Sequence, residues 1–157
     1  MLASFFIMWP VFQAGFSLLA NKIPDNKFDE ESWFFRVHRW ELNGRIYEKV
    51  FKIRFWKRLL PDGAAVFDKG FRKKKLKTLD SEYLKAFIKE TCRAEWAHWM
   101  QITPFWLFGL WAPPPVIWFM LAYALLVNIP CIIAQRYNRP RLKRLLRDLD
   151  KKHSALQ

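Results

Sequence analysis

The sequence predicts an all-α integral membrane protein, with about three transmembrane helices and interfacial amphipathic helices on the cytoplasmic side. Hydrophobic residues make up 52% of the 157-residue chain, which nevertheless has a net charge of +13. The charges are segregated: residues 1–20 have none, and residues 94–134 have one, Glu95. Every Lys and Arg lies in residues 21–93 or 135–157. We therefore expect a single membrane domain, residues 1–157, in the cell (inner) membrane.

Three apolar stretches are long enough to cross a bilayer: about residues 2–20, 94–112 and 116–134. At ~1.5 Å per residue, each approaches the ~30 Å thickness of a hydrocarbon core. The run Pro113–Pro115 separates the last two and predicts a tight reversal. Because Lys and Arg favour the cytoplasmic side, both basic regions should lie there. The N-terminus is then outside, the C-terminus is cytoplasmic, and the protein is multi-pass.

Residues 21–93 form the expected cytoplasmic interfacial segment, in which aromatic side chains alternate with Lys and Arg. Apolar side chains recur every four residues, at Tyr47, Phe51, Phe55 and Leu59. This spacing favours an interfacial amphipathic helix, although Phe51, Ile53 and Phe55 also alternate as a strand would. Residues 60–63 are typical of a turn, and residues 72–75 form a basic run suited to acidic lipid.

A helix is expected to begin near Asp80 or Ser81, both good N-caps, and to be interrupted at Thr103-Pro104. On it, Glu95 and His98 are spaced i,i+3, so their side chains can touch. Ionisable groups at membrane depth are costly and often mark a functional site. The pair therefore predicts a catalytic site; the alternative is a structural polar pair that ties this helix to another.

The last segment, residues 139–152, is predicted to be a basic amphipathic helix on the inner leaflet. Its leucines follow helical spacing, at Leu142, Leu145, Leu146 and Leu149. Residues 135–141 form a polar junction, in which Pro140 should end the preceding membrane span. This junction is expected near the depth of Glu95 and His98.

Two motifs give the chain a family resemblance. The sequence QRYNRPRLKRLL after an apolar span, together with ETCRAEWAHW, resembles the small membrane glycosyl-4,4'-diaponeurosporenoate acyltransferases. The segments Asn21–Pro24 and Phe55–Lys57 are also similar. The resemblance implies transfer of a fatty acyl chain to a sugar hydroxyl of a glycosylated carotenoid acid or similar glycolipid. The matching positions, taken as substrate-binding candidates beside Glu95 and His98, are Glu90, Arg93, Asn128, Gln135, Arg136, Tyr137, Asn138, Arg139 and Arg141.

Acyl transfer to a hydroxyl needs a base and donors for the oxyanion. We expect His98 to be the base, Glu95 to orient its imidazole, and Arg136, Arg139 or Asn138 to supply donors. Because no Ser or Cys lies next to His98, direct transfer is favoured over an acyl-enzyme. A second, weaker acid/base candidate is His38 with Glu41.

No phosphate loop or metal motif is present, so no bound cofactor or metal is expected. Acyl-CoA or acyl carrier protein would be the co-substrate, and the other partners would be membrane lipids, the lipidic glycosylated acceptor and, in a homo-oligomer, a second copy. A nucleic-acid partner is not expected, because the basic residues flank apolar spans and suit anionic headgroups. The competing function is a non-catalytic membrane scaffold, in which Glu95 and His98 pack against Gln13 or Asn128.

Overall fold

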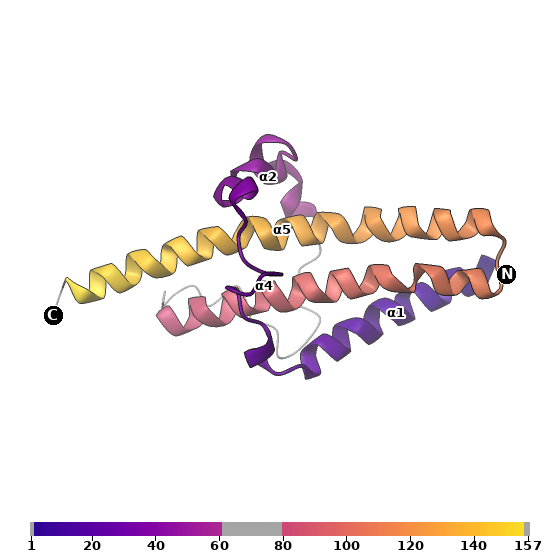
Figure 1. Ribbon diagram of the computed structural model, residues 1–157, viewed down its shortest axis with the longest axis horizontal. Coiled ribbons are helices and arrows are strands. Elements are labelled where there is room, and N and C mark those ends of the chain that lie inside the picture. The colour runs from indigo at the N-terminus through magenta and orange to yellow at the C-terminus, as the bar shows by residue number, and fades with distance from the viewer. Residues whose placement is uncertain (1, 61–79, 156–157) are drawn as a thin grey trace.

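The computed structural model describes residues 2–60 and 80–155, and every regular element in these ranges is helical. Three long helices run alongside one another: α1 (Leu2–Lys22), α4 (Ser81–Ile102) and α5 (Pro114–Ser154) (Figure 1). Shorter elements connect them: η1 (Asp25–Lys27), η2 (Arg39–Gly44), α2 (Arg45–Lys49), α3 (Ile53–Trp56), η3 (Lys57–Leu59) and η6 (Thr103–Leu110). The predicted all-α fold is confirmed.

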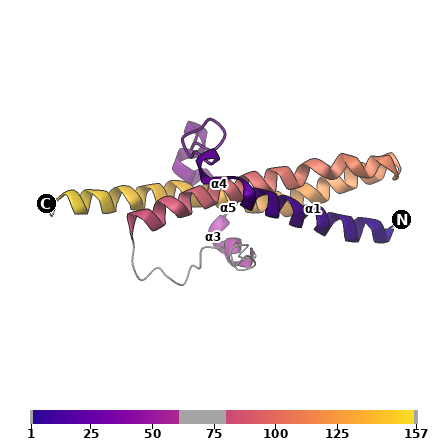
Figure 2. The same cartoon turned by 90° about the horizontal axis from the view of Figure 1, so that it is seen from below.

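The apolar core fills one end of this three-helix arrangement. In both views the N-terminus and the turn between η6 and α5 lie at the same end, and the C-terminus lies at the other (Figures 1 and 2). The buried core residues there are Trp9, Ile102, Phe108, Met120, Ala124 and Ile132. The outer face of α5 remains apolar but exposed, with Trp118, Phe119 and Leu126 each about 70% accessible. An apolar surface of this kind suits contact with lipid.

In the described part of the chain, α5 is the one helix long and apolar enough to cross a bilayer. Its apolar half, residues 114–134, runs beside η6, the second half of α4 and α1 (Figure 1). The turn predicted at residues 60–63 lies mostly outside the described residues. The basic run at 72–75 lies entirely outside them.

Both predicted boundaries of α4 are confirmed. Its N-cap is Asp80, whose Oδ1 accepts a hydrogen bond from the Glu82 backbone N–H at 3.4 Å. The α-helix ends at Ile102, directly before Thr103-Pro104, and the chain continues as the tighter helix η6. Proline at the start of η6 costs no hydrogen bond, because the first N–H groups of a helix have no intrahelical acceptor.

The predicted end of the helix at Pro140 is wrong. A single helix of 41 residues, α5, passes through Pro130 and Pro140 and merges the third span with the basic segment 139–152. At ~1.5 Å per residue it is ~60 Å long. Side chains on both sides of Pro140 are held by neighbouring elements: Arg139 by Glu95 and Arg141 by Glu48. These contacts keep the helix continuous where the local sequence predicts an end.

The predicted interfacial helix through Tyr47, Phe51, Phe55 and Leu59 is also wrong. The chain there forms α2, α3 and η3, and it breaks at Lys52, which has a φ of 47°. This break lets Tyr47 and Ile53 both pack against the α5 residues Ile133, Ala134 and Tyr137. A continuous helix could not direct both side chains to α5, so burial there outweighs the local i,i+4 pattern.

Gly44 is required where η2 meets α5, and we expect Gly44→Ala to destabilise the protein by ~1–2 kcal/mol. Its φ is 83°, and an added Cβ would lie 3.0 Å from Cγ of Pro140. Thermal unfolding of the purified protein in detergent measures the effect. The matched control is Gly15→Ala in α1, because an added Cβ there meets nothing within 4 Å. A Gly44→Ala protein as stable as the Gly15→Ala protein would contradict the prediction.

Candidate functional site

A cluster of four charged side chains, three of them buried and one, Arg136, partly buried, joins α4, α5 and η2. We call it the ionic cluster; its members are Glu41, Glu95, Arg136 and Arg139. The two oxygens of Glu95 accept hydrogen bonds from Arg136 and Arg139, each at 2.6 Å. Oε1 of Glu41 accepts from Arg136 at 2.7 Å. The cluster has two positive and two negative charges, which is how charges are tolerated away from water.

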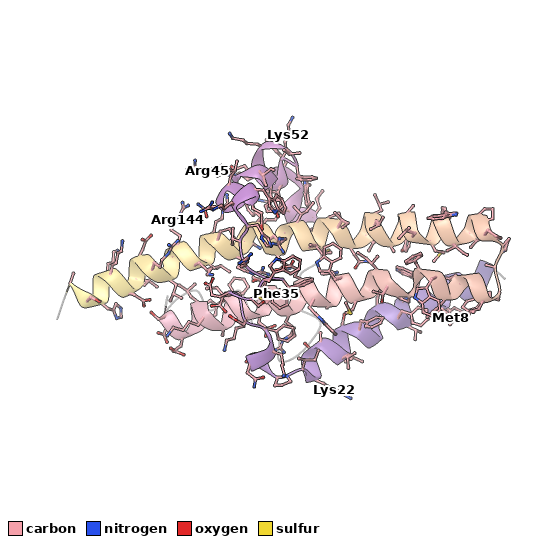
Figure 3. All side chains as sticks on the ribbon, viewed as in Figure 1. Met8, Lys22, Phe35, Arg45, Lys52 and Arg144 are labelled. Carbon is pink, nitrogen blue, oxygen red and sulfur yellow. The ribbon has the colours of Figure 1, made fainter. Side chains whose placement is uncertain are left out.

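The helical spacing of the sequence builds this cluster. Arg136 and Arg139 are i,i+3 on α5 and so point to one face, toward α4. Thr91 lies one turn before Glu95 on α4, and its Oγ1 accepts from Nε of Arg139 at 3.0 Å. Nη1 of Arg139 donates to the Phe35 carbonyl at 2.6 Å. Figure 3 places Phe35 between α4 and α5. Arg139 thereby ties the 34–41 segment to both long helices.

Arg136 uses all five of its N–H groups inside the protein. Two donate to Glu41, one to Glu95, and the others to the backbone carbonyls of Phe34 and Arg36, at 2.6–3.3 Å. Its side chain is 12% exposed and that of Arg139 is 1% exposed. A ligand would have to displace one of these contacts to bind Arg136. The geometry therefore favours a positioning role for this arginine.

The carboxylate of Glu41, a candidate acid/base partner of His38 in the sequence, pairs with Arg136 instead. Burial opposes its ionisation, but hydrogen bonds from Arg136, the His38 backbone N–H and the Tyr47 hydroxyl outweigh it, so its pKa lies below its ordinary value. The Tyr47 hydroxyl donates to Oε2 at 2.9 Å. Burial and the neighbouring carboxylate raise the pKa of Tyr47. The Trp40 ring stacks beside His38, with ring centroids 6.4 Å apart.

The lowered pKa of Glu41 predicts a loss of stability in acid. The folded state binds fewer protons than the unfolded state here, so the stabilisation is complete above the ordinary pKa of 4.5 and falls as pH drops through the folded pKa. We expect Tm to fall on acidification below about pH 4.5, and Glu41→Gln to have a lower Tm at neutral pH with a flatter acid limb. Thermal unfolding between about pH 3 and 7 tests this. The control is Glu82→Gln, an exposed carboxylate; equal acid limbs for Glu41→Gln and wild type would exclude Glu41 as the source.

His98 does not share the contacts of Glu95. Its Nδ1 lies 2.9 Å from Oδ1 of Asn128 on α5, and its imidazole also interacts with Gln101. The amide Nδ2 of Asn128 donates to the Ala124 carbonyl at 2.9 Å, which turns Oδ1 toward the imidazole. Because Oδ1 is an acceptor, Nδ1 must carry the proton, and Nε2 is then the basic nitrogen. The expected orienting partner, Glu95, is replaced by Asn128.

A second polar cluster lies around Tyr137, between α5 and the α2–η3 segment. We call it the Tyr137 cluster; its members are Glu48, Arg54, Lys57, Tyr137, Asn138 and Arg141. Nζ of Lys57 donates to Oδ1 of Asn138 at 2.6 Å. The guanidinium of Arg141 stacks 3.4 Å from the Tyr137 ring centroid and donates to Glu48 at 2.9 Å. Three residues predicted at the junction are therefore brought together here.

The remaining predicted residues lie apart from these clusters. Arg93 pairs with Asp25 and, at 3.4 Å, with Glu90, which ties η1 to the first half of α4. Burial raises the pKa of Glu90. Gln135 is half-buried on α5. A contact that sequence reasoning missed joins α1 to α4: the Gln101 amide donates to the Gln13 carbonyl at 3.1 Å.

The family model and the curated relatives that match this chain carry the same description. The family model described as glycosyl-4,4'-diaponeurosporenoate acyltransferase matches residues 30–148. The curated glycosyl-4,4'-diaponeurosporenoate acyltransferases of Staphylococcus aureus strains Newman and USA300 are each 35% identical over 144 residues. These alignments cover 92% of this chain and 87% of the relative. No solved structure matches the chain.

Proposed function

Since this chain belongs to the glycosyl-4,4'-diaponeurosporenoate acyltransferase family and is an acyltransferase, we propose that it acylates a sugar hydroxyl of a glycosylated carotenoid acid or a similar glycolipid. The names of its relatives support the acceptor, and the match extends over 92% of the chain. The single structural observation behind the mechanism is the His98–Asn128 contact, which leaves Nε2 as a base.

The arrangement of the helices supports a three-span position in the cell membrane. In this proposal α1, the second half of α4 with η6, and the apolar half of α5 cross the bilayer. The labelled basic residues Lys22, Arg45, Lys52 and Arg144 lie away from the end that holds Met8 (Figure 3). Lys and Arg favour the cytoplasmic side, so the N-terminus lies outside and the C-terminus inside. Because α5 is continuous, its basic half would extend into the cytoplasm instead of lying on the leaflet.

His98 acts as the general base in this mechanism. Nε2 takes the proton of the sugar hydroxyl, the oxygen attacks the carbonyl of an acyl thioester, and a tetrahedral oxyanion forms. Its collapse breaks the carbon–sulfur bond, and the imidazolium returns the proton to the thiolate of coenzyme A or acyl carrier protein. Asn128 fixes the tautomer, which is a role that an orienting residue has in hydrolase triads.

Glu95 and the two arginines position the base instead of reacting. They hold α4 and α5 in register three residues from His98, and an error of ~1 Å in such a register can cost ~10²-fold in rate. The amides of Gln135 and Asn138, at the end of the apolar half of α5, are candidates for contact with the sugar. No residue of the ionic cluster is needed as an oxyanion donor.

Acylation by the purified protein in detergent tests the proposal. The reaction contains a glycosylated carotenoid acid and acyl-CoA, and mass spectrometry reads the product. A product heavier by one acyl group supports both substrates. If none forms, acyl-acyl carrier protein replaces acyl-CoA, and then a membrane lipid extract replaces the carotenoid. If a product forms only with another glycolipid, the glycosylated carotenoid acid is not the acceptor. If no combination of donor and acceptor gives a product, the proposed function is wrong.

A further inference from the structure

An apolar groove runs along the outer face of α5, away from His98. Its volume is about 540 Å³. Its walls include Phe51 and Trp56 on one side and Ala122, Leu125, Leu126 and Ile133 of α5 on the other. Asn128, which binds His98, lies on the face of α5 that is buried against α4. The groove therefore opens to the surroundings of α5 and not to the base.

A basic pocket lies on the segment that also supplies Phe51 and Trp56 to the groove. Its volume is about 490 Å³, and it is lined by Glu48, Lys52, Arg54, Phe55 and Arg58. Phe51 and Trp56 of the groove are chain neighbours of Lys52 and Phe55 of the pocket, so the same short segment lines both hollows. Within the described residues, Lys52 and Arg58 form no ion pair. Figure 3 shows Lys52 at the outer edge of this segment.

The apolar groove and the cations near it follow one another along α5. The groove spans Ala122 to Ile133, ~16 Å of helix, within the apolar half. Tyr137 follows one turn later and is contacted by Arg54 at 3.4 Å and by Lys57. Arg54 and Lys57 therefore lie at the end of the groove nearest the basic half of α5. Residues 45–60 contain six Lys and Arg against one acid, Glu48.

We propose that this groove and pocket bind one anionic phospholipid of the inner leaflet, with an acyl chain against α5 and the phosphate at Lys52 and Arg58. An apolar channel that ends in cations is complementary to a chain that ends in a phosphate. A bilayer lipid can enter from the side, because Leu126 is 75% exposed. The proposal uses the bilayer position of α5 given above but none of the proposed chemistry.

Photo-crosslinking tests the site without any acyl-transfer reaction. The full chain is placed in phosphatidylcholine nanodiscs with phosphatidylglycerol whose acyl chain carries a diazirine. Crosslinks should map to residues 51–56 and 122–133, and unlabelled phosphatidylglycerol should compete. The matching phosphatidylcholine probe should label at least about tenfold less. Equal labelling by both probes, or crosslinks spread over other helices, would overturn the proposal.

Paired variants test the two halves of the site. Lys52→Gln with Arg58→Gln should reduce labelling by phosphatidylglycerol about tenfold or more, whereas Arg144→Gln with Lys152→Gln removes the same charge elsewhere and should not. Ala122→Trp should fill the groove and reduce labelling. The control for that substitution is Val127→Trp, which lies outside the groove.

Two further outcomes would also overturn the proposal. One is an equal loss of phosphatidylglycerol labelling in the Lys52→Gln/Arg58→Gln and the Arg144→Gln/Lys152→Gln proteins. The other is competition by acyl-CoA but not by phosphatidylglycerol, which would identify the acyl donor as the occupant. Circular dichroism and gel filtration are used to check that each variant is folded. Because the labelling does not require acyl transfer, a failure of the proposed acyl-transfer reaction would leave this result unaffected.

Discussion

Exchange of Glu95 for glutamine is expected to destabilise the protein by ~3–5 kcal/mol, the cost of leaving a buried charge without its partner. The side chain of Glu95 is 0% exposed and neutralises Arg136 and Arg139 at once. Glutamine retains one acceptor oxygen but no charge, so the ionic cluster would be left with a net charge of +1. We expect a lower Tm in detergent and a smaller yield of monodisperse protein.

The matched control for this substitution is Glu48→Gln. Glu48 also pairs with an arginine of α5, Arg141, but both side chains are about one third exposed. Pairs of that kind contribute about 0–1 kcal/mol. The comparison also separates a structural from a chemical role. If Glu95→Gln keeps the wild-type Tm and loses turnover, Glu95 acts on the reaction and the positioning role is wrong.

The sequence predicts those helix boundaries that depend on neighbouring residues. The cap at Asp80 and the stop at Thr103-Pro104 depend on residues within one turn, and both boundaries of α4 are where these signals place them. The cost of an unpaired carboxylate at Glu95 likewise predicts a polar partner. The sequence around Glu95 cannot identify that partner, because Arg136 is 41 residues away and Glu41 is 54 residues away. Pairing at such separations depends on how the helices pack.

The two wrong predictions of secondary structure, at Pro140 and at Lys52, have one physical cause. At Pro140 and at Lys52 the local signal is overridden by contacts made to another element. Proline removes one backbone hydrogen bond from a helix, but the ion pairs of Arg139 and Arg141 hold both sides of it in place. Lys52 adopts a left-handed conformation, which costs ~1–2 kcal/mol. Burial of Ile53, which is 0% exposed, against α5 offsets that cost.

Replacement of His98 by alanine is expected to lower the rate of acyl transfer by ~10²–10⁴-fold, the usual contribution of a general base. The imidazole is half-buried and contacts the neutral side chains of Asn128 and Gln101, so its removal breaks neither of the ion pairs of Glu95. Turnover should therefore fall while Tm changes little. Initial rates with the substrates identified by the acylation assay give the measurement.

The histidines elsewhere in the chain decide whether this effect is chemical. His38 is the other candidate base, but its neighbours are the rings of Trp33 and Trp40, and the carboxylate of Glu41 accepts from its backbone and not from its ring. We expect His38→Ala to keep most of its activity, and His153→Ala, at the exposed end of α5, to match wild type. A rate loss confined to His38→Ala would identify His38, directly before η2, as the general base in place of His98 on α4. A loss confined to His98→Ala, with unchanged Tm, would locate proton transfer where Asn128 holds the ring, on the α4–α5 face next to the ionic cluster.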